Sequence, residues 1–303
     1  MGNFHGLPTR SIGNGHLAVE FLSEAGPRIV RLMLTRTALG INQLAEVPQV
    51  KWDTPYGEFF VRGGHRLWHA PETAPRTYMP DNVGLIITDV PGGVELRQPA
   101  EAVTGIGKSI TIELAPDRAA LTVTHRLYNE GMWPIELAPW AITQLPHGGV
   151  IVLPQWQRPT TSELLPNRQL VLWPYTRWSD SRLSLNDDFI LLNATPRLPP
   201  CKVGYFNQHG WAGYLCDGVF FIKRFKPQPG LPHVDFGCNA ETYCNDKFVE
   251  LETLGPLSKL EPGQAATHVE EWEFYTGVTP STTLEKVRAT VANLKLPAEG
   301  LLL

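Results

Sequence analysis

Two glutamates near the C-terminal end, Glu250 and Glu252, stand two residues apart. The surrounding segment, 247–254, alternates apolar and polar side chains, so both carboxylates are expected on one face of a strand. Two carboxylates so close would raise the pKa of one of them, which suits general acid–base chemistry near neutral pH. A solvated strand face explains the pair equally well without any chemistry, and both interpretations stay open.

A second group of candidate residues lies in the segment 65–69, HRLWH. In an extended strand His65 and His69 share one face, while Arg66 and Trp68 share the other, although the two preceding glycines could relax this alternation. A histidine can transfer a proton near neutral pH, but an ordinary hydrogen-bonded histidine is the competing interpretation for both. Arg66 and Trp68 could bind a polar ring by hydrogen bonds and stacking.

Histidines and carboxylates also alternate in the segment 266–275, where His268 and Glu270 share a face. Such a pair on neighbouring strands could bind a divalent metal, but the spacing is common in sheets, so we predict no metal and no cofactor. His125, on an apolar strand face, is expected to be a core histidine. The four cysteines form no C-x-x-C pair, the spacing typical of zinc sites, and we expect reduced thiols in a cytoplasmic protein.

The chain has nine tryptophans, and the long aperiodic segment 154–188 holds three of them, at positions 156, 173 and 178. Long loops on a β scaffold often carry binding surfaces. Aromatic rings stack on the apolar faces of sugars, so Trp68, Trp140 and the loop tryptophans could form a binding platform. Core packing and cover for the sheet are the competing explanation.

In the segments that must position these residues, the pattern of apolar and polar side chains has a period of two. Apolar and polar side chains alternate, with turn signals about every ten residues, which is typical of β sandwiches and barrels. The expected strands are 83–90, 94–98, 109–114, 121–128, 135–143, 218–225, 247–254 and 266–275. Only one helix is expected, at 284–294, after a capping box formed by Thr282 and Glu285. We therefore predict an all-β fold with a short C-terminal helix, in a single domain, 1–303.

Composition excludes several classes of function. Hydrophobic residues make up 43% of the chain and charged residues 18%, as in globular proteins. The net charge is −4 and the basic residues are not clustered, so no nucleic-acid partner is expected. No apolar stretch approaches the roughly 20 residues of a membrane helix, and no signal peptide is visible at the start. The oligomeric state is left open by the sequence.

Three stretches together resemble the galactose-mutarotase-like superfamily, in a branch divergent from the aldose 1-epimerases. The first is GPRIV at 26–30 with GIN at 40–42, similar to the family's opening strand and turn. The second is RGGHRLW at 62–68, similar to G-R-x-x-N-R-I. The third is the ending, with ELE at 250–252 and LEPG at 260–263 before a closing strand. This resemblance implies a β-supersandwich, and it implies a small-molecule carbohydrate as the partner.

The same resemblance implies roles for individual residues. The family's sugar-binding arginine falls on Arg66 and its catalytic base on Glu252. Asn82 and Glu250 are expected to contact the sugar as well, together with the aromatic residues of the platform. Mutarotation needs the base to take a proton from the anomeric hydroxyl and an acid to protonate the ring oxygen.

This sequence departs from the family at the proton donor. The family's histidine follows a segment that begins with Asn and ends several residues later with Pro, here NEGMWP at 129–134, and it falls on or near Trp140, which cannot transfer a proton. Its second histidine is also absent, because Asn82 is followed by Val83. His65, His69 and His147 are candidates for a replacement. The hypotheses are an isomerase with Glu252 as base and Arg66 orienting the sugar, a sugar-binding module without turnover, and a structural or interaction domain.

Overall fold

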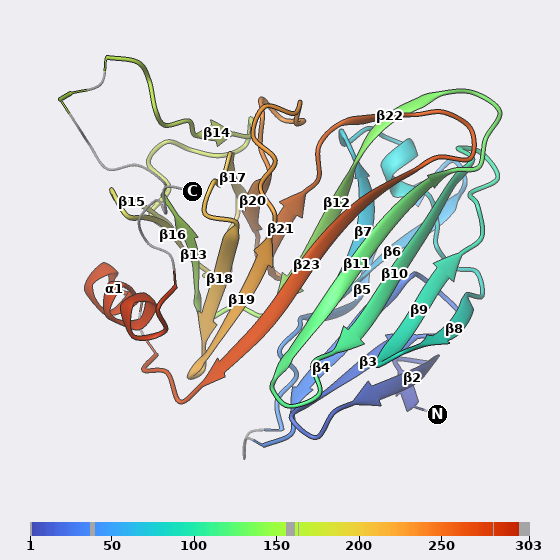
Figure 1. Ribbon diagram of the computed structural model, residues 1–303, viewed down its shortest axis with the longest axis horizontal. Helices are drawn as coiled ribbons and strands as arrows, with labels where there is room; N and C mark the ends of the chain where they lie inside the picture. Colours follow the sequence, from blue (N-terminus) through green and yellow to red (C-terminus); the bar gives the residue numbers. More distant parts are fainter. Residues whose placement is uncertain (1, 37–39, 156–160, 163, 281, 297–303) are drawn as a thin grey trace.

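A computed structural model describes residues 2–36, 40–155, 161–162, 164–280 and 282–296. Two large antiparallel sheets form stacked layers in this part of the chain (Figure 1). In the described ranges one helix and one 3₁₀ turn accompany them, α1 (Leu284–Asn293) and η1 (Arg76–Tyr78). No helix within the described ranges is long and apolar enough to cross a bilayer.

The first sheet, sheet I, has eleven strands among the described residues, ten of them along one path and β22 paired with β12. In spatial order they are β1 (Gly2–Phe4), β2 (Leu7–Gly13), β3 (Leu17–Leu22), β4 (Arg28–Leu34), β7 (His65–Ala70), β12 (Ile135–Leu145), β21 (Val249–Leu254), β20 (Ala240–Cys244), β17 (Cys201–Tyr205) and β14 (Val171–Leu172), with β22 at Ser258–Leu260.

The second sheet, sheet II, has ten strands in the described part of the chain. Their order is β15 (Leu183–Leu185), β16 (Phe189–Asn193), β13 (Val150–Pro154), β18 (Trp211–Cys216), β19 (Val219–Phe225), β23 (Ala265–Thr276), β11 (Ala120–Asn129), β10 (Ile106–Leu114), β9 (Gly93–Gln98) and β8 (Ile86–Val90). A separate hairpin is formed by β5 (Glu46–Thr54) and β6 (Gly57–Gly63).

The main core lies between the two sheets, because each strand turns one set of alternate side chains inward. Leu67 of β7, Leu251 of β21 and Val123 of β11 are among its members. The opposite face of sheet I has its own apolar cluster, which packs against the β5–β6 hairpin and includes Phe59, Trp68 and Trp140. Sheet I is therefore buried on both faces at its neighbouring strands β7 and β12.

Helix α1 packs on the outer face of sheet II (Figure 1). Its buried residues Val287 and Val291 are four apart, which places them on one side of the helix against Trp211 and Phe220. The residue that precedes the first helical turn is Thr283, one position later than the predicted capping box. The eight predicted strands all coincide with observed ones to within a few residues.

Two glycines connect the hairpin to β7. Gly63 and Gly64 both have positive φ, +91° and +72°, and a Cβ on Gly64 would lie 2.0 Å from the carbonyl oxygen of Ile29. The amide of Gly64 donates to the carbonyl of Ala45, 2.9 Å away. Only glycine fits this turn and close approach. The backbone becomes extended again from His65, so the alternation along 65–69 holds.

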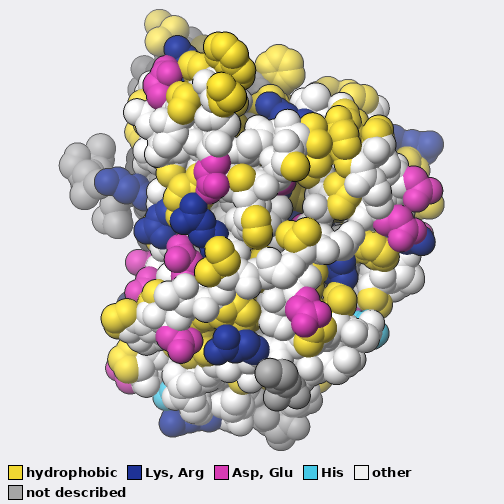
Figure 2. Space-filling view, turned by 90° about the vertical axis from the view of Figure 1, so that its right-hand side faces the viewer, with side chains coloured by type: hydrophobic (Ala, Val, Ile, Leu, Met, Phe, Trp, Pro, Cys, Tyr) yellow, Lys and Arg dark blue, Asp and Glu magenta, His cyan; other side chains and the backbone are white. Residues whose placement is uncertain are grey.

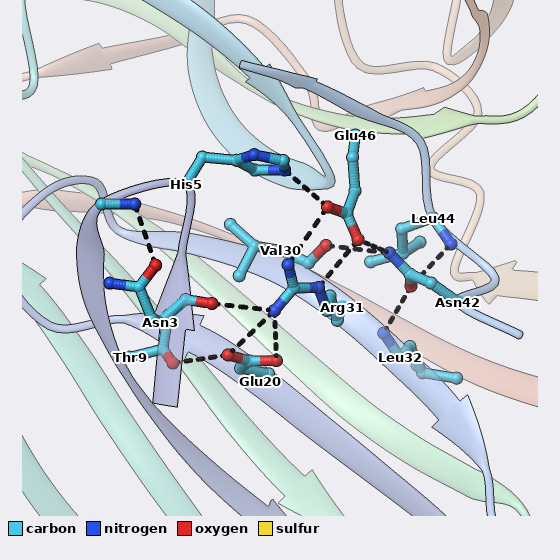
Figure 3. Close-up of polar contacts among 11 residues, drawn as sticks. Asn3, His5, Thr9, Glu20, Val30, Arg31, Leu32, Asn42, Leu44 and Glu46 are labelled. Carbon is cyan, nitrogen blue, oxygen red and sulfur yellow. Dashed lines mark hydrogen bonds and ion pairs between the residues drawn. The ribbon is translucent and has the colours of Figure 1, made fainter. Parts of the chain in front are cut away.

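A polar network fixes the base of the hairpin (Figure 3). Arg31 of β4 donates from Nε to Glu46, the first residue of β5, over 2.7 Å, and also pairs with Glu20 of β3. Asn42 accepts from the amides of Leu32 and Leu44 and donates to Glu46. The GIN motif thus holds the hairpin over sheet I.

Basic side chains are dispersed on the face shown in Figure 2, where they lie singly or in small groups among acidic, apolar and uncharged ones.

Candidate functional site

A cleft of about 430 Å³ opens on the face of sheet I that is turned away from sheet II. Half of its lining residues are aromatic, and the lining comes from the hairpin, from η1, from sheet I and from the 154–188 segment. The aromatic residues are Trp52, Trp68, Tyr78, Trp140, Trp173, Tyr175, Tyr243 and Phe248. The volume lies within the range of small-molecule sites.

The strand register places a row of five side chains across the floor of sheet I. Arg28 pairs with Arg66, Arg66 with Ile142, Ile142 with Glu252, and Glu252 with Glu241. Residues paired in an antiparallel sheet share a face. Cations therefore stand at one end of this row and carboxylates at the other, with an apolar residue between them.

Arg66 is buried beside the cleft and is only 2% exposed. Its guanidinium lies over the ring of Trp68, 4.6 Å from the ring centroid, a favourable cation–π distance. Its Nε and Nη1 have no hydrogen-bond partner among the described residues. Burial, and then the neighbouring charge of Arg28, lower the pKa of Arg66 to about 9.

Other cations surround Arg66 on the side away from the glutamates. Arg28 is paired with Asp81 over 2.6 Å, and Arg62 donates to the side chain of Asn82. Asn82 is exposed, also donates to the carbonyl of Glu58 and does not line the cleft. The structure therefore does not bring Asn82 together with Arg66 in the cleft.

A buried lysine pairs with the glutamates of the row. Lys202 Nζ lies 2.7 Å from Glu241 and 2.9 Å from Glu252, and it stands 4.6 Å from the ring centroids of Trp140 and of Trp173. Burial disfavours the charged form of Lys202, but the two carboxylates outweigh it and raise its pKa well above the ordinary value. Lys202 therefore keeps its proton.

Glu252 is fully buried, next to the floor of the cleft. Its Oε2 accepts from the indole Nε1 of Trp140 over 2.7 Å and from Lys202, while its Oε1 has no hydrogen-bond partner among the described residues. Trp140, which the sequence resemblance aligned with the family's proton donor, thus donates its indole N–H to Glu252.

Glu250 lines the cleft two residues away on the same strand face. Its Oε1 accepts from Nε2 of Gln144 over 2.8 Å. Burial, followed by the charge of Glu252, raises the pKa of Glu250 to about 7, although Arg66 and Lys202 act in the opposite direction. Glu250 can therefore change protonation state near neutral pH.

His65 and His69 lie on the other face of β7, turned into the core between the sheets. His65 Nε2 is 2.7 Å from Nε2 of His125 in sheet II, and its Nδ1 is 2.9 Å from the hydroxyl of Thr143. His69 is fully buried, and neither ring nitrogen has a hydrogen-bond partner in the described part of the chain. Strand alternation thus separates both histidines from Arg66, as it would in any extended segment.

The core network around His65 also contains Glu270, one of the two residues of the metal hypothesis, but it groups Glu270 with His65 and His125 and not with His268. One ligand atom each of His65, His125 and Glu270 lie within 4.8 Å of one another. Glu270 is already paired with Lys223 over 2.7 Å and accepts from the indole of Trp272. These polar side chains of the described residues thus already have partners. A metal ion would have to compete with the ammonium of Lys223 for the carboxylate of Glu270. His147, the third candidate proton donor, faces the carbonyl of Asn245 at 3.0 Å and does not line the cleft.

Sequence reasoning missed several residues of the cleft and of the charged row at its floor. Lys202 and Glu241 were not singled out, although a lysine inside the apolar strand CKVGY is a recognisable signal of a buried charge with a partner. Of the loop tryptophans, Trp173 lines the cleft, Trp178 is exposed, and position 156 lies outside the described residues. The hairpin that carries Trp52 was not foreseen.

No protein-family model and no curated protein matches the sequence. Solved structures do match. A galactose mutarotase-like protein from Lactobacillus casei ATCC 334 superposes with a TM-score of 0.57 and 12% identity, over 88% of this chain and 100% of that one. A proposed aldose 1-epimerase from Klebsiella pneumoniae superposes with a TM-score of 0.59 and 11% identity, over 100% of this chain and 88% of that one. Another proposed aldose 1-epimerase, from Escherichia coli K12, superposes with a TM-score of 0.54 and 14% identity, over 89% of this chain and 100% of that one.

The fold therefore defines the class. The chain has the galactose-mutarotase-like β-supersandwich fold with a short C-terminal helix, and this prediction of the fold is confirmed. At 11 to 14% identity the shared property is the fold.

Proposed function

We propose that the protein binds a small-molecule carbohydrate in the aromatic cleft and that Arg66 orients the sugar. The observation that carries the proposal is the guanidinium of Arg66, which is buried against Trp68 with Nε and Nη1 unpaired among the described residues. Unpaired buried donors cost about 1–3 kcal/mol each, which a ligand with acceptor oxygens recovers.

The composition of the cleft supports a sugar over a purely apolar ligand. Trp68 and Trp140 meet edge to face with ring centroids 5.3 Å apart in the wall of the cleft, where they are 8% and 3% exposed. Trp52 and Tyr175 also line the cleft, are 44% and 37% exposed, and present more open ring surface to the C–H face of a pyranose. Glu250 and Gln144 add acceptors and donors next to these rings for the hydroxyl groups. The substrate-binding set that we propose is therefore Arg66, Trp68, Trp140 and Glu250.

Calorimetry with D-glucose, D-galactose, D-mannose and D-xylose tests this proposal. We expect binding by at least one sugar and a loss of affinity of about 10- to 100-fold in Arg66→Met, since a hydrogen bond to a charged group contributes about 1.5–3 kcal/mol. Arg10→Met is the matched control, because Arg10 lies on the surface with only a 3.8 Å contact to Asp89. Absence of binding by every sugar would favour a structural or interaction domain.

A second candidate function is isomerase activity of the mutarotase type on the bound sugar. It is favoured by Glu250, a carboxyl group in the cleft whose pKa burial raises to about 7. The resemblance assigned the base to Glu252, but its Oε2 is engaged by Trp140 and Lys202. We therefore propose that Glu250 transfers the proton and that the charge of Glu252 helps to raise the pKa of Glu250. NMR exchange between the anomers, with and without protein, distinguishes this enzyme from a binding module.

We further propose a cytoplasmic location. It is supported by the four cysteines, all of which are free thiols. Labelling with a thiol reagent after rapid acid quenching of cells is expected to find all four reduced.

A further inference from the structure

An aldose ring opens only if two protons move. One leaves the anomeric hydroxyl, and one reaches the ring oxygen as the bond between C1 and that oxygen breaks. The usual solution is a base on one side and an acid on the other. Among the residues that line the cleft within the described ranges there is no histidine, and Trp140 stands where the acid is expected.

The other protic groups of the cleft are poor acids. The paired carboxylates hold the pKa of Lys202 far above the ordinary value. Burial raises the pKa values of Tyr78, Tyr175 and Tyr243. The carboxylate of Glu72 accepts from the hydroxyl of Tyr78. Lys247, which also lines the cleft, is paired with Asp246 over 2.7 Å. Glu250, whose pKa burial raises to about 7, is a lining group that can both give and take a proton near neutral pH.

We propose that Glu250 alone catalyses anomer exchange by using its two oxygens together, one as acid and one as base. The inference rests on the proposed binding of a sugar in this cleft. In the neutral carboxyl group, Oε2–H donates its proton to the ring oxygen while Oε1 accepts the proton of the anomeric hydroxyl. The bond from C1 to the ring oxygen breaks, its electron pair goes to that oxygen, and C1 becomes an aldehyde.

The step is balanced without a second catalytic residue. One proton enters the carboxyl group and one leaves it, so Glu250 stays neutral throughout. Rotation about the C1–C2 bond presents the other face of the aldehyde, and the reverse transfers close the ring as the opposite anomer. The anomeric hydroxyl and the ring oxygen share one carbon, so the two oxygens of a single carboxyl group can reach both.

Gln144 is the positioning residue for this arrangement. Its Nε2 donates to Oε1 of Glu250 over 2.8 Å, which makes Oε1 the carbonyl-like oxygen and leaves the proton on Oε2. Gln144 sits directly opposite Glu250 in the β12–β21 register, so its amide is fixed by the sheet. Oε1 retains a second lone pair for the anomeric hydroxyl.

The pH profile separates this mechanism from simple base catalysis. A neutral carboxyl group is the active form, so anomer exchange is expected to be fastest below pH 7 and to fall as the pH rises through about 7, where Glu250 loses its proton. A carboxylate acting as base would give the opposite dependence. Glu252→Gln removes a charge that raises the pKa of Glu250, so the falling limb is expected to move to lower pH.

The experiment uses the full chain and the tightest-binding aldose of the four named above. Polarimetry or NMR exchange measures anomer conversion between pH 5 and 9, and calorimetry measures binding separately. At sugar concentrations that saturate each protein, as set by its own calorimetric affinity, we expect Glu250→Gln to lose at least about 100-fold of the acceleration. Glu250→Asp, which keeps the carboxyl group, is expected to restore part of it.

Two results overturn the inference while leaving sugar binding intact. One is wild-type protein that binds a sugar without accelerating anomer exchange. The other is acceleration that persists in Glu250→Gln or that increases with pH through 7. If no aldose binds, the proposed function and this inference fall together, and the calorimetric result identifies that case.

Discussion

Lys202 illustrates how the floor of the cleft tolerates charge. Its ammonium is almost completely buried, yet it contacts two carboxylates within 3 Å and the faces of two tryptophans. Burying an ion is costly unless partners replace its water, and the removal of one partner leaves an uncompensated charge. The triad of Lys202, Glu241 and Glu252 is therefore sensitive to any single change.

Lys202→Met is expected to lower the free energy of unfolding by about 3–5 kcal/mol, because Glu241 and Glu252 would be left buried without a cation. Urea denaturation followed by circular dichroism measures the loss. The double variant Lys202→Met with Glu241→Gln is expected to recover part of it. Lys259→Met is the control, since this exposed lysine has only a 3.5 Å surface contact and should change stability by less than about 0.5 kcal/mol. Equal stability of Lys202→Met and wild type would contradict the account of the triad.

For individual residues, the sequence could predict which side chains share a strand face but not which other side chains they contact. Alternation along 65–69 correctly separates Arg66 from His65, because a strand has a fixed period of two. The contacts of Glu252 could not be foreseen, since its partners Trp140 and Lys202 lie 112 and 50 residues away. Such pairings depend on strand order, which local patterns do not contain.

The β5–β6 hairpin is the element that turns a flat sheet face into a cleft. Phe59 and Trp52 of the hairpin stack with ring centroids 5.6 Å apart, and Phe59 contacts Trp68 on the sheet. The hairpin pairs with no other strand in the described ranges, so its position depends on side-chain packing and on the polar network at its base. Asn42 is central to that network.

Asn42→Ala is expected to destabilise the fold by about 1–3 kcal/mol, because the amides of Leu32 and Leu44 lose their acceptor. The same change is expected to weaken sugar binding, since the hairpin that carries Trp52 loses its anchor. Gln43→Ala is a matched control, because the exposed hydrogen bond of its side-chain amide goes to the carbonyl of Ile41, two residues away. Thermal denaturation and calorimetry report the two effects, and unchanged values in both would refute the anchoring role of Asn42.

Across the whole molecule, the core between the sheets contains a cluster of neutral histidines. Burial lowers the pKa of His125 to about 4 and that of His268 to about 3, and it lowers the pKa of His65 well below the ordinary value. Their hydrogen bonds to one another, to Thr143 and to Thr253 suit the neutral rings. Protonation of the cluster would place cations next to Lys223.

The free energy of unfolding is therefore expected to fall as the pH decreases below about 6.5. Between that pH and about 4, the unfolded chain binds protons at histidines that stay neutral in the folded protein. Each such histidine contributes up to about 1.4 kcal/mol per pH unit. Glu250 acts with the opposite sign between about pH 4.5 and 7, because it keeps a proton that the unfolded chain releases. Burial raises the pKa of Glu241 as well, so Glu241 acts in the same direction as Glu250. Measurements in Glu250→Gln remove the contribution of Glu250.

Chemical denaturation at several pH values gives this slope, and NMR of the imidazole nitrogens gives the protonation states directly. Signals of His125 and His268 that titrate near pH 6.5 in the folded protein would contradict the prediction. The same denaturation curves also test the domain organisation. It remains a prediction that residues 1–303 form a single domain. This prediction implies one cooperative unfolding transition that all probes report at the same denaturant concentration.

The overall architecture was more predictable than the site. Period-two segments and their turns indicated an all-β sandwich, and the three stretches that together resemble the galactose-mutarotase-like superfamily narrowed the predicted fold to a supersandwich. The cleft was not predictable to the same degree, because it combines β7, β12, β17, β20 and β21 with a hairpin whose strands face solvent on one side. Exposed strands such as β5 lack the clear apolar alternation that reveals a buried one.

The aromatic lining also gives the protein an optical signal of its own. Four of the nine indoles, those of Trp52, Trp68, Trp140 and Trp173, border the cleft, whereas Trp211 and Trp272 are fully buried elsewhere. A sugar that displaces water from the first group changes the polarity around those fluorophores and leaves the buried ones as a constant background. Intrinsic emission can therefore rank unlabelled ligands before any assay of turnover exists.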